Sequence, residues 1–255
     1  MENTNLEIAY YIVQIIVSIL ITIGLSILLY KETVKGNKIK IIENTVELAR
    51  YYEENIIKNI SFFQQLFNQA GLTNILIDKN KYSKYKEFDK DEFSNIFEND
   101  IDKMDEKVQA PIYRTTALNL YNLMFCPSDD MKVKIDNEKL ADNKSAESQT
   151  VHLIVSNLAM ETLNRMEHFA MNFNCNIAIS QNVYESLSPS FITAVRLFYR
   201  QIVSKNIDTE PDNYYSNIIE LYKKWSQNKE KTQKEINENI KDGKKRTKTP
   251  IEKCK

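Results

Sequence analysis

Glycine and proline are scarce in this chain of 255 residues, which contains four glycines and five prolines. Turns between strands depend most on these two residue types, because glycine accepts positive φ and proline presets a turn conformation. We therefore predict an all-α protein, built from long helices with few connections. The formal net charge of −1 gives no overall attraction to nucleic acid.

Cysteines are few and widely separated, which excludes the usual cysteine-based frameworks. Cys126, Cys175 and Cys254 are odd in number and form no CxxC pair. Neither a disulfide framework nor a zinc site fits this spacing. We expect free thiols.

Motifs of known enzyme classes are also absent. The chain has no P-loop, GxGxxG, HExxH or nucleophile elbow. Its two histidines, His152 and His168, would lie about 24 Å apart on one helix, too far to share a metal. Glu167 and His168 could form an acid/base pair, but adjacent helical residues point about 100° apart, which favours two ordinary positions. We predict no enzyme, no metal and no cofactor.

Charged side chains are absent from Ile8 to Tyr30, a run of 23 residues. As a helix this run is roughly 34 Å long, enough to cross a ~30 Å hydrocarbon core. Residues 1–7 carry two acids and no basic residue, whereas residues 31–40 carry four lysines. The positive-inside rule then predicts a single transmembrane helix over residues 8–30 in a bacterial cell membrane. Residues 1–7 lie outside and the rest of the chain is cytoplasmic. A cleaved signal peptide fits poorly, because no basic leading region or small-residue cleavage site is present.

Polar residues recur every four positions within the run, and at ~100° per residue they share one third of the helix surface. They are Gln14, Ser18, Thr22 and Ser26. Three interpretations are open. The hydroxyls could bond to carbonyls one turn earlier, the stripe could be a small-residue interface between helices, or several copies could line a pore with it. A pore needs about four copies, so it requires a homo-oligomer.

A juxtamembrane or stalk segment is expected over residues 31–71, with a helix from about Ile39 to Ala70 that Gly71 ends. Apolar residues alternate steps of three and four along it, broken only by Glu53. The heptad spacing favours a stalk that meets its own copies, and the width of the apolar face favours packing inside a domain. Gly36 is the only break expected between this helix and the span.

Residues 72–240 are expected to form a cytosolic helical domain. An acidic amphipathic helix is predicted from Glu87 to Glu106, and another between Pro111 and Pro127. Residues 128–150 read as a loop with at most a turn or two of helix. Further helices are predicted from Val151 to about Asn174, around residues 177–187, from the Ser188 cap through Val203, and from Pro211. Residues 241–255 carry seven basic and two acidic side chains, typical of a disordered tail.

Two groups of residues are candidates for ligand binding. Cations alternate with aromatic rings in Lys79, Lys81, Tyr82, Lys84, Tyr85 and Lys86. This combination could hold phosphates while bases stack, although the stretch could equally be a solvated loop or lie on anionic lipid. Arg196, Tyr199 and Arg200 form the second group. The two arginines, one helical turn apart, could grip an anion or pair with an acidic helix.

A resemblance is carried by residues 163–170, by Val183-Tyr184 and by Phe191 to Arg200. This stretch resembles a helical domain of uncharacterised bacterial membrane-anchored proteins, which implies that Asn164 and Glu167 are interhelical hydrogen-bonding groups. The layout of one polar-striped span before a helical body is similar to the membrane effector of the Hailong antiphage system. That likeness implies an oligomeric ion channel controlled by short single-stranded DNA from a partner nucleotidyltransferase, acting in abortive infection.

We therefore expect a homo-oligomeric membrane effector whose cytosolic domain binds an anionic ligand and gates a pore. The alternative is a membrane-anchored scaffold that conducts nothing and recruits a protein partner, for which the acidic helix suits a basic surface.

Overall fold

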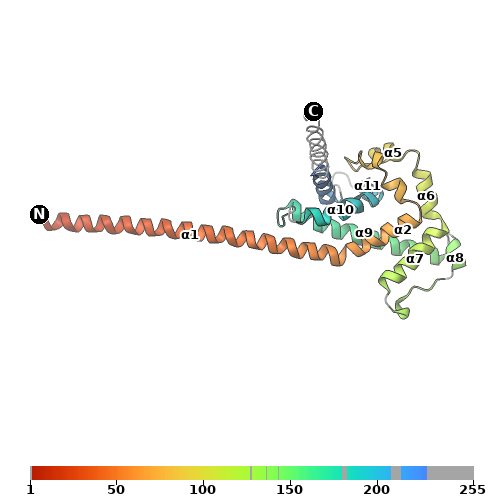
Figure 1. Ribbon diagram of the computed structural model, residues 1–255, viewed down its shortest axis with the longest axis horizontal. Helices are drawn as coiled ribbons and strands as arrows, with labels where there is room; N and C mark the ends of the chain where they lie inside the picture. Colours follow the sequence, from red (N-terminus) through yellow and green to blue (C-terminus); the bar gives the residue numbers. More distant parts are fainter. Residues whose placement is uncertain are drawn as a thin grey trace, which may run out of the picture.

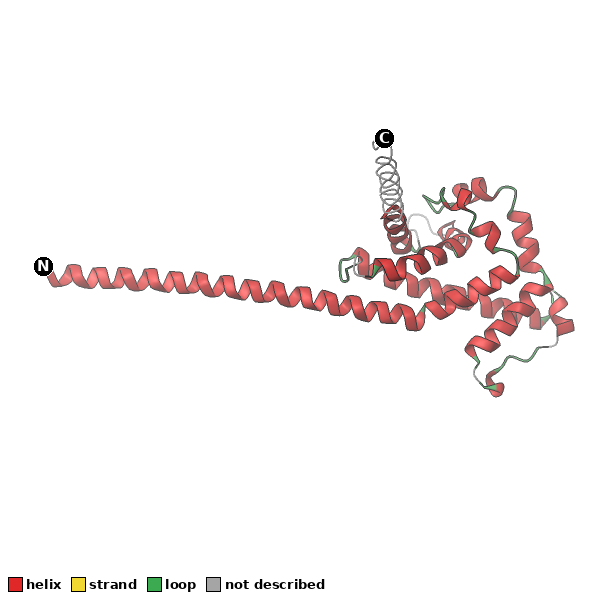
Figure 2. Ribbon diagram, in the orientation of Figure 1, coloured by secondary structure: helices red, strands yellow, loops and turns green. Residues whose placement is uncertain are grey.

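The computed structural model describes residues 2–126, 128–135, 137–142, 144–179, 183–207 and 214–228. Of residues 2–24 and 26–29, and of 129, 137 and 207, only the backbone is described. Within these ranges the chain forms helices and no strand (Figure 2). The all-α prediction is confirmed.

The helices follow one another with short connections. In chain order they are α1 Glu2–Asn55, α2 Ile57–Gln69, α3 Thr73–Leu76, α4 Lys79–Tyr82, α5 Lys90–Phe97, α6 Ile101–Gln109, α7 Pro111–Phe125, the 3₁₀ turn η1 Asp129–Met131, α8 Asn137–Ala141, α9 Ala146–Asn174, α10 Tyr184–Leu197, α11 Tyr199–Ile207 and a helix over residues 216–228. The helix over 216–228 is the last within the described ranges and is called the last helix below.

Helix α1 projects from a compact helical body, with the N-terminus at its far end (Figure 1). It runs without interruption through Gly36, so the break expected there is absent. Gly36 has no heavy atom within 4 Å of where a Cβ would lie, so nothing packs there to bend the helix. The helix therefore connects residues 8–30 to the body as one continuous element.

No helix meets the length and hydropathy needed to cross a bilayer within the part of the chain whose side chains the structure describes. The predicted span over residues 8–30 lies almost entirely outside that part, as do the side chains of Gln14, Ser18, Thr22 and Ser26. The basic tail over residues 241–255 also lies outside the described residues.

A kink at Ile56 divides the long helix that was predicted from Ile39 to Ala70. Ile56 has φ −114°, and Arg165 on α9 donates from Nη1 to the carbonyl oxygen of Asn55 at 2.7 Å. A side chain that takes a backbone carbonyl in this way is a recognised cause of helix kinks. The expected end at Gly71 is confirmed. Gly71 has φ +69°, and Leu72 donates to the Phe67 carbonyl at 2.8 Å, completing a Schellman motif.

The largest fully buried side chains of the core are mostly aromatic, and many of them lie on α2, α9, α10 and the last helix. Trp225 is fully buried, with its ring centroid 5.2 Å from that of Phe191 and 5.8 Å from that of Phe173. Phe63 on α2 meets Phe198 at 4.8 Å. Such pairs stabilise a core beyond the area they bury, and they fix the long helices against one another.

Some helix boundaries differ from prediction. The acidic stretch from Glu87 to Glu106 forms two helices, α5 and α6, because Asp89 caps α5 by accepting from Glu92 N at 2.7 Å and the chain turns again at Asp100. Pro189 lies inside α10 and does not begin it. Leu187 is 2% exposed, so burial of the preceding turn outweighs the one hydrogen bond that proline removes. Residues 177–179 and 183 are not helical, residues 184–187 of the helix expected around 177–187 belong to α10, and Phe198 interrupts the predicted helix that ended at Val203.

Other boundaries are confirmed. Pro111 is the first residue of α7, and α7 ends at Phe125 just before Pro127.

Asn164 and Glu167 on α9 are interhelical hydrogen-bonding groups, as the resemblance implied. Asn164 accepts from Tyr215 Oη at 3.4 Å, and Glu167 accepts from the backbone amides of residues 217 and 218 at 3.0 and 2.9 Å. The Glu167 carboxylate thereby caps the start of the last helix.

Candidate anion-binding cavity

A cavity of about 620 Å³ opens between α4, the loop after it, α10 and the last helix. Its volume lies in the range of small-ligand sites. The residues lining it are Lys79, Tyr82, Ser83, Tyr85, Lys86, Glu87, Arg196, Tyr222, Lys223, Ser226 and Gln227. Four of these are cations and one is an acid, so the wall carries an excess of positive charge.

Arg196 and Tyr82 form the central contact of the cavity. The guanidinium carbon lies 3.5 Å from the Tyr82 ring centroid, a stacked cation–π arrangement. Arg196 Nε also donates to Tyr222 Oη at 3.4 Å. Arg196 is half-buried and makes no ion pair with any acid in the described part of the chain. Aromatic rings therefore hold the charged group in place, and no acid in the described part of the chain forms an ion pair with it.

Tyr85 forms the floor and is stacked on Tyr199, with the ring centroids 3.7 Å apart and the planes 10° apart. Tyr85 Oη donates to the Leu76 carbonyl at 3.1 Å, and Tyr199 Oη donates to Glu92 at 2.5 Å. Burial raises the pKa of both phenols, and the Glu92 hydrogen bond raises that of Tyr199 further. Both rings therefore stay neutral and fixed.

The loop between α4 and α5 is held in a strained conformation by one carboxylate. Phe88 is fully buried and has φ +60°, a region that bulky residues rarely adopt. Glu92 accepts hydrogen bonds from three successive backbone amides, those of Lys86, Glu87 and Phe88, at 2.7, 2.7 and 3.2 Å. Asn206 Nδ2 donates to the Phe88 carbonyl at 3.1 Å. These bonds satisfy the loop backbone and position Lys86 at the cavity.

Five of the predicted ligand-binding residues meet at this cavity, although they come from distant parts of the chain. They are Lys79, Tyr82, Tyr85, Lys86 and Arg196. Lys84 is exposed but is not among the lining residues.

The other predicted residues are engaged elsewhere. Lys81 pairs with Asp100, and Arg200 donates to Asp105 on α6 at 2.6 Å. Pairing with an acidic helix was the alternative left open for the two arginines, and it is confirmed for Arg200. Tyr199 is fully buried beneath Tyr85, so it supports the cavity from behind and does not line it.

Sequence reasoning missed the contribution of the last helix, which supplies Tyr222, Lys223, Ser226 and Gln227. Ser226 Oγ is buried there without a hydrogen-bond partner in the described part of the chain, and such a group gains when a ligand supplies one. Lys223 beside Tyr222 repeats the cation and ring pairing of the stretch from Lys79 to Lys86, and that repetition was the signal available in the sequence.

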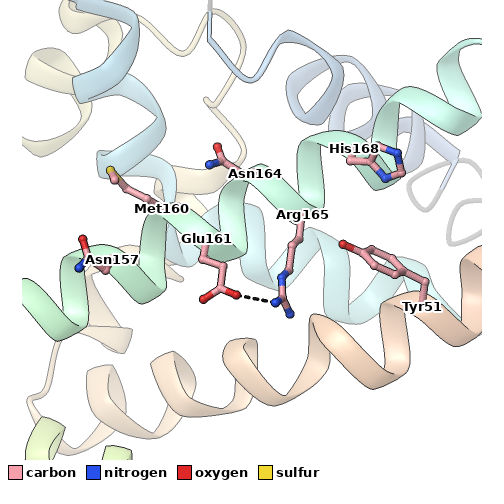
Figure 3. A pocket seen from close by; sticks show the side chains of 7 residues that line it. All are labelled: Tyr51, Asn157, Met160, Glu161, Asn164, Arg165 and His168. Carbon is pink, nitrogen blue, oxygen red and sulfur yellow. Dashed lines mark hydrogen bonds and ion pairs between the residues drawn. The ribbon is translucent and has the colours of Figure 1, made fainter. Parts of the chain in front are cut away.

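A second, shallower hollow of about 430 Å³ lies where α1 meets α9 (Figure 3). Figure 3 shows Arg165 beside Glu161, with which it forms an ion pair at 2.5 Å. Tyr51 meets His168 edge to face, with the ring centroids 6.2 Å apart. Arg165 also donates to the carbonyl oxygen of Asn55 at the α1–α2 kink. The charged groups of this hollow therefore bind one another and the kinked backbone, and the hollow is the weaker candidate for a ligand site.

Helix α10 links the cavity to α1. Arg196 lies near its C-terminal end, and Ser190, two turns earlier, hydrogen-bonds Tyr52 of α1 at 3.2 Å. Tyr52 is fully buried and its ring lies 4.5 Å from Phe169. Helix α10 thus joins the cavity wall to the C-terminal end of α1.

No protein-family model, curated protein or solved structure matches this chain.

Proposed function

We propose that this protein is an oligomeric, single-span membrane effector of bacteria in which an anionic ligand at the cavity controls a pore. The observation that carries the ligand part is Arg196, which is stacked on Tyr82 and has no ion-pair partner among the described residues, in a cavity lined by three lysines and one acid. The pore part rests on the sequence of residues 8–30. The protein is proposed to have no enzymatic activity.

The chemistry of the cavity suits a ligand with phosphates and planar rings. Lysines bind phosphate as mobile point charges, and an arginine stacked on a ring can extend the stack to a base. Single-stranded nucleic acid has both features, and a short single-stranded DNA is the ligand that the Hailong likeness implies. In that system a partner nucleotidyltransferase makes the DNA.

Gating is proposed to act through α10. A ligand that draws Arg196 toward its phosphates would shift α10, and the Ser190 to Tyr52 hydrogen bond would carry the shift to α1. Because α1 is continuous through Gly36, a rotation or tilt of its C-terminal end is transmitted to residues 8–30. In the proposed oligomer of about four copies, Gln14, Ser18, Thr22 and Ser26 line the pore.

The role inferred from the likeness is antiphage defence by abortive infection, in which an open pore dissipates the gradients of the infected cell's inner membrane. The body is then cytoplasmic, with the N-terminus outside.

Two measurements test the proposal. Binding of a labelled short single-stranded DNA is followed by electrophoretic shift at about 50 and about 200 mM salt, and we expect weaker binding at the higher salt because phosphate contacts release counterions. Ion flux through liposomes that contain the protein should change when the same DNA is added. Salt-independent binding rejects the phosphate site, and flux equal to that of empty liposomes under both conditions rejects the pore.

A non-conducting scaffold is the second candidate, favoured by the acidic outer surface of α5 and α6. Asp91, Glu98, Asp102 and Glu106 are all exposed there. Such a surface suits a basic protein partner. If the detergent-solubilised protein is a monomer, the channel is excluded and the scaffold is the remaining candidate.

A further inference from the structure

Helix α1 carries a row of exposed apolar side chains where it leaves the body. Ile39 is 48% exposed, Ile42 47% and Val46 55%. Their spacing of three and four places them on one stripe of the helix. Large apolar residues exposed singly need no explanation, but a continuous stripe of β-branched residues marks a contact surface.

The stripe is distinct from the face that α1 turns toward its own body. Thr45, Leu48, Tyr52 and Ile56 are buried against the body, and Thr45 Oγ1 accepts from the backbone amide of Ile179 at 2.9 Å. At ~100° per residue the two faces lie about a quarter turn apart. A neighbour can therefore lie along the stripe while the body of the same chain stays in place beside it.

The charges that flank the stripe fit a second copy of the same helix in parallel. In heptad positions Ile39 and Val46 are a and Ile42 is d, so Lys38 falls at g and Glu43 at e. A parallel, in-register pair places each g side chain beside the e side chain of the partner. Lys38 and Glu43 are both exposed and opposite in sign, so the pairing is attractive in this register.

We propose that Ile39, Ile42 and Val46 form the seam along which α1 packs, parallel and in register, against α1 of a second copy. The inference rests on the homo-oligomer of the proposed function and adds the place where the copies meet outside residues 8–30. The seam has isoleucine at d, with isoleucine and valine at a, in place of the leucine at d that favours two helices, consistent with a ring. The seam would also hold the gating helices together at a defined distance from the cavity.

Site-directed cross-linking of the full-length protein in lipid nanodiscs tests the seam. In a background of Cys175→Ser and Cys254→Ser, we expect Ile42→Cys to give a covalent dimer on mild oxidation. Lys40→Cys is the matched control, because Lys40 is exposed and lies about 200° round the helix from Ile42. It should remain uncross-linked. Equal cross-linking at both positions overturns the seam.

The register has its own test in the Ile42→Cys background. Lys38→Glu places like charges side by side, so we expect a several-fold lower yield of dimer, restored when Glu43→Lys is added to the same chain. A yield that Lys38→Glu leaves unchanged overturns the parallel register.

The mass of the assembly separates this inference from the proposed function. An assembly of several copies without an Ile42→Cys cross-link overturns the seam and leaves the oligomer standing. A single copy per assembly overturns both.

Discussion

Arg196 on α10 stacks on Tyr82 at the end of α4, with its guanidinium 3.5 Å from the ring centroid. This contact predicts the effect of a charge-conserving substitution. Arg196→Lys keeps the charge but loses the planar group, so we expect roughly tenfold weaker binding of short single-stranded DNA, about 1.4 kcal/mol. Arg200→Lys is the control, since Arg200 pairs with Asp105 away from the cavity. Equal losses in the two variants, measured by electrophoretic shift, count against the assigned site.

Glu92 holds the strained loop through three backbone amides and the Tyr199 hydroxyl. Glu92→Gln removes the charge and half of the acceptor capacity, so the free energy of unfolding should fall by about 1–3 kcal/mol. DNA binding should also weaken, because the loop positions Lys86. Urea titration followed by circular dichroism measures the stability. Glu98→Gln, at an exposed position, should change neither quantity, and an unaffected Glu92→Gln variant would show that the clamp is unimportant.

The pair of Lys81 and Asp100 predicts a pH dependence of stability. The hydrogen bond from Lys81 lowers the pKa of the Asp100 carboxyl below its ordinary value of about 3.9. The folded state therefore binds this proton less readily than the unfolded state does. The contribution is complete above the ordinary pKa and is lost as pH falls through the lowered one.

Lys81→Met should reduce the free energy of unfolding at neutral pH and flatten its decline on acidification. Urea unfolding at neutral pH and at about pH 3 measures both effects. Lys103→Met is the control, because Lys103 is 65% exposed and lies 3.4 Å from the other carboxylate oxygen, where an exposed pair contributes little. The assignment fails if Lys103→Met has the larger effect.

The polar stripe predicts where ions pass. The double substitution Thr22→Leu with Ser26→Leu replaces two polar groups with apolar ones, so ion flux through liposomes should be lost while the assembly keeps its mass. Ile23→Leu lies off the stripe and should conduct as the natural chain does. Flux that survives the double substitution rejects a pore lined by these residues.

The sequence allowed the helical class and several helix ends to be predicted, because these depend on local chemistry. Proline at the start of α7 and glycine after α2 act within one turn of chain. Pro189 misled the prediction since the turn before it is buried by tertiary contacts, which no local rule contains. The kink at Ile56 depends on Arg165 of a distant helix.

The sequence indicated which residue types could bind an anion, but it did not predict that the two groups lie at one cavity. Lys79 to Lys86 and Arg196 are far apart in the chain, and only packing brings α4 beside α10. A continuous helix through Val203 would place Tyr199 one turn from Arg196. In the structure the helix ends at Phe198, and Tyr199 is buried behind Tyr85.

The proposed pore requires several copies to assemble in the bilayer, and the mass of the detergent-solubilised protein tests this directly. Light scattering with correction for bound detergent should give about four times the 29.9 kDa of one chain, or about 120 kDa of protein. A protein mass of 29.9 kDa at concentrations where the protein is active would contradict the account, because one helix cannot enclose a pore.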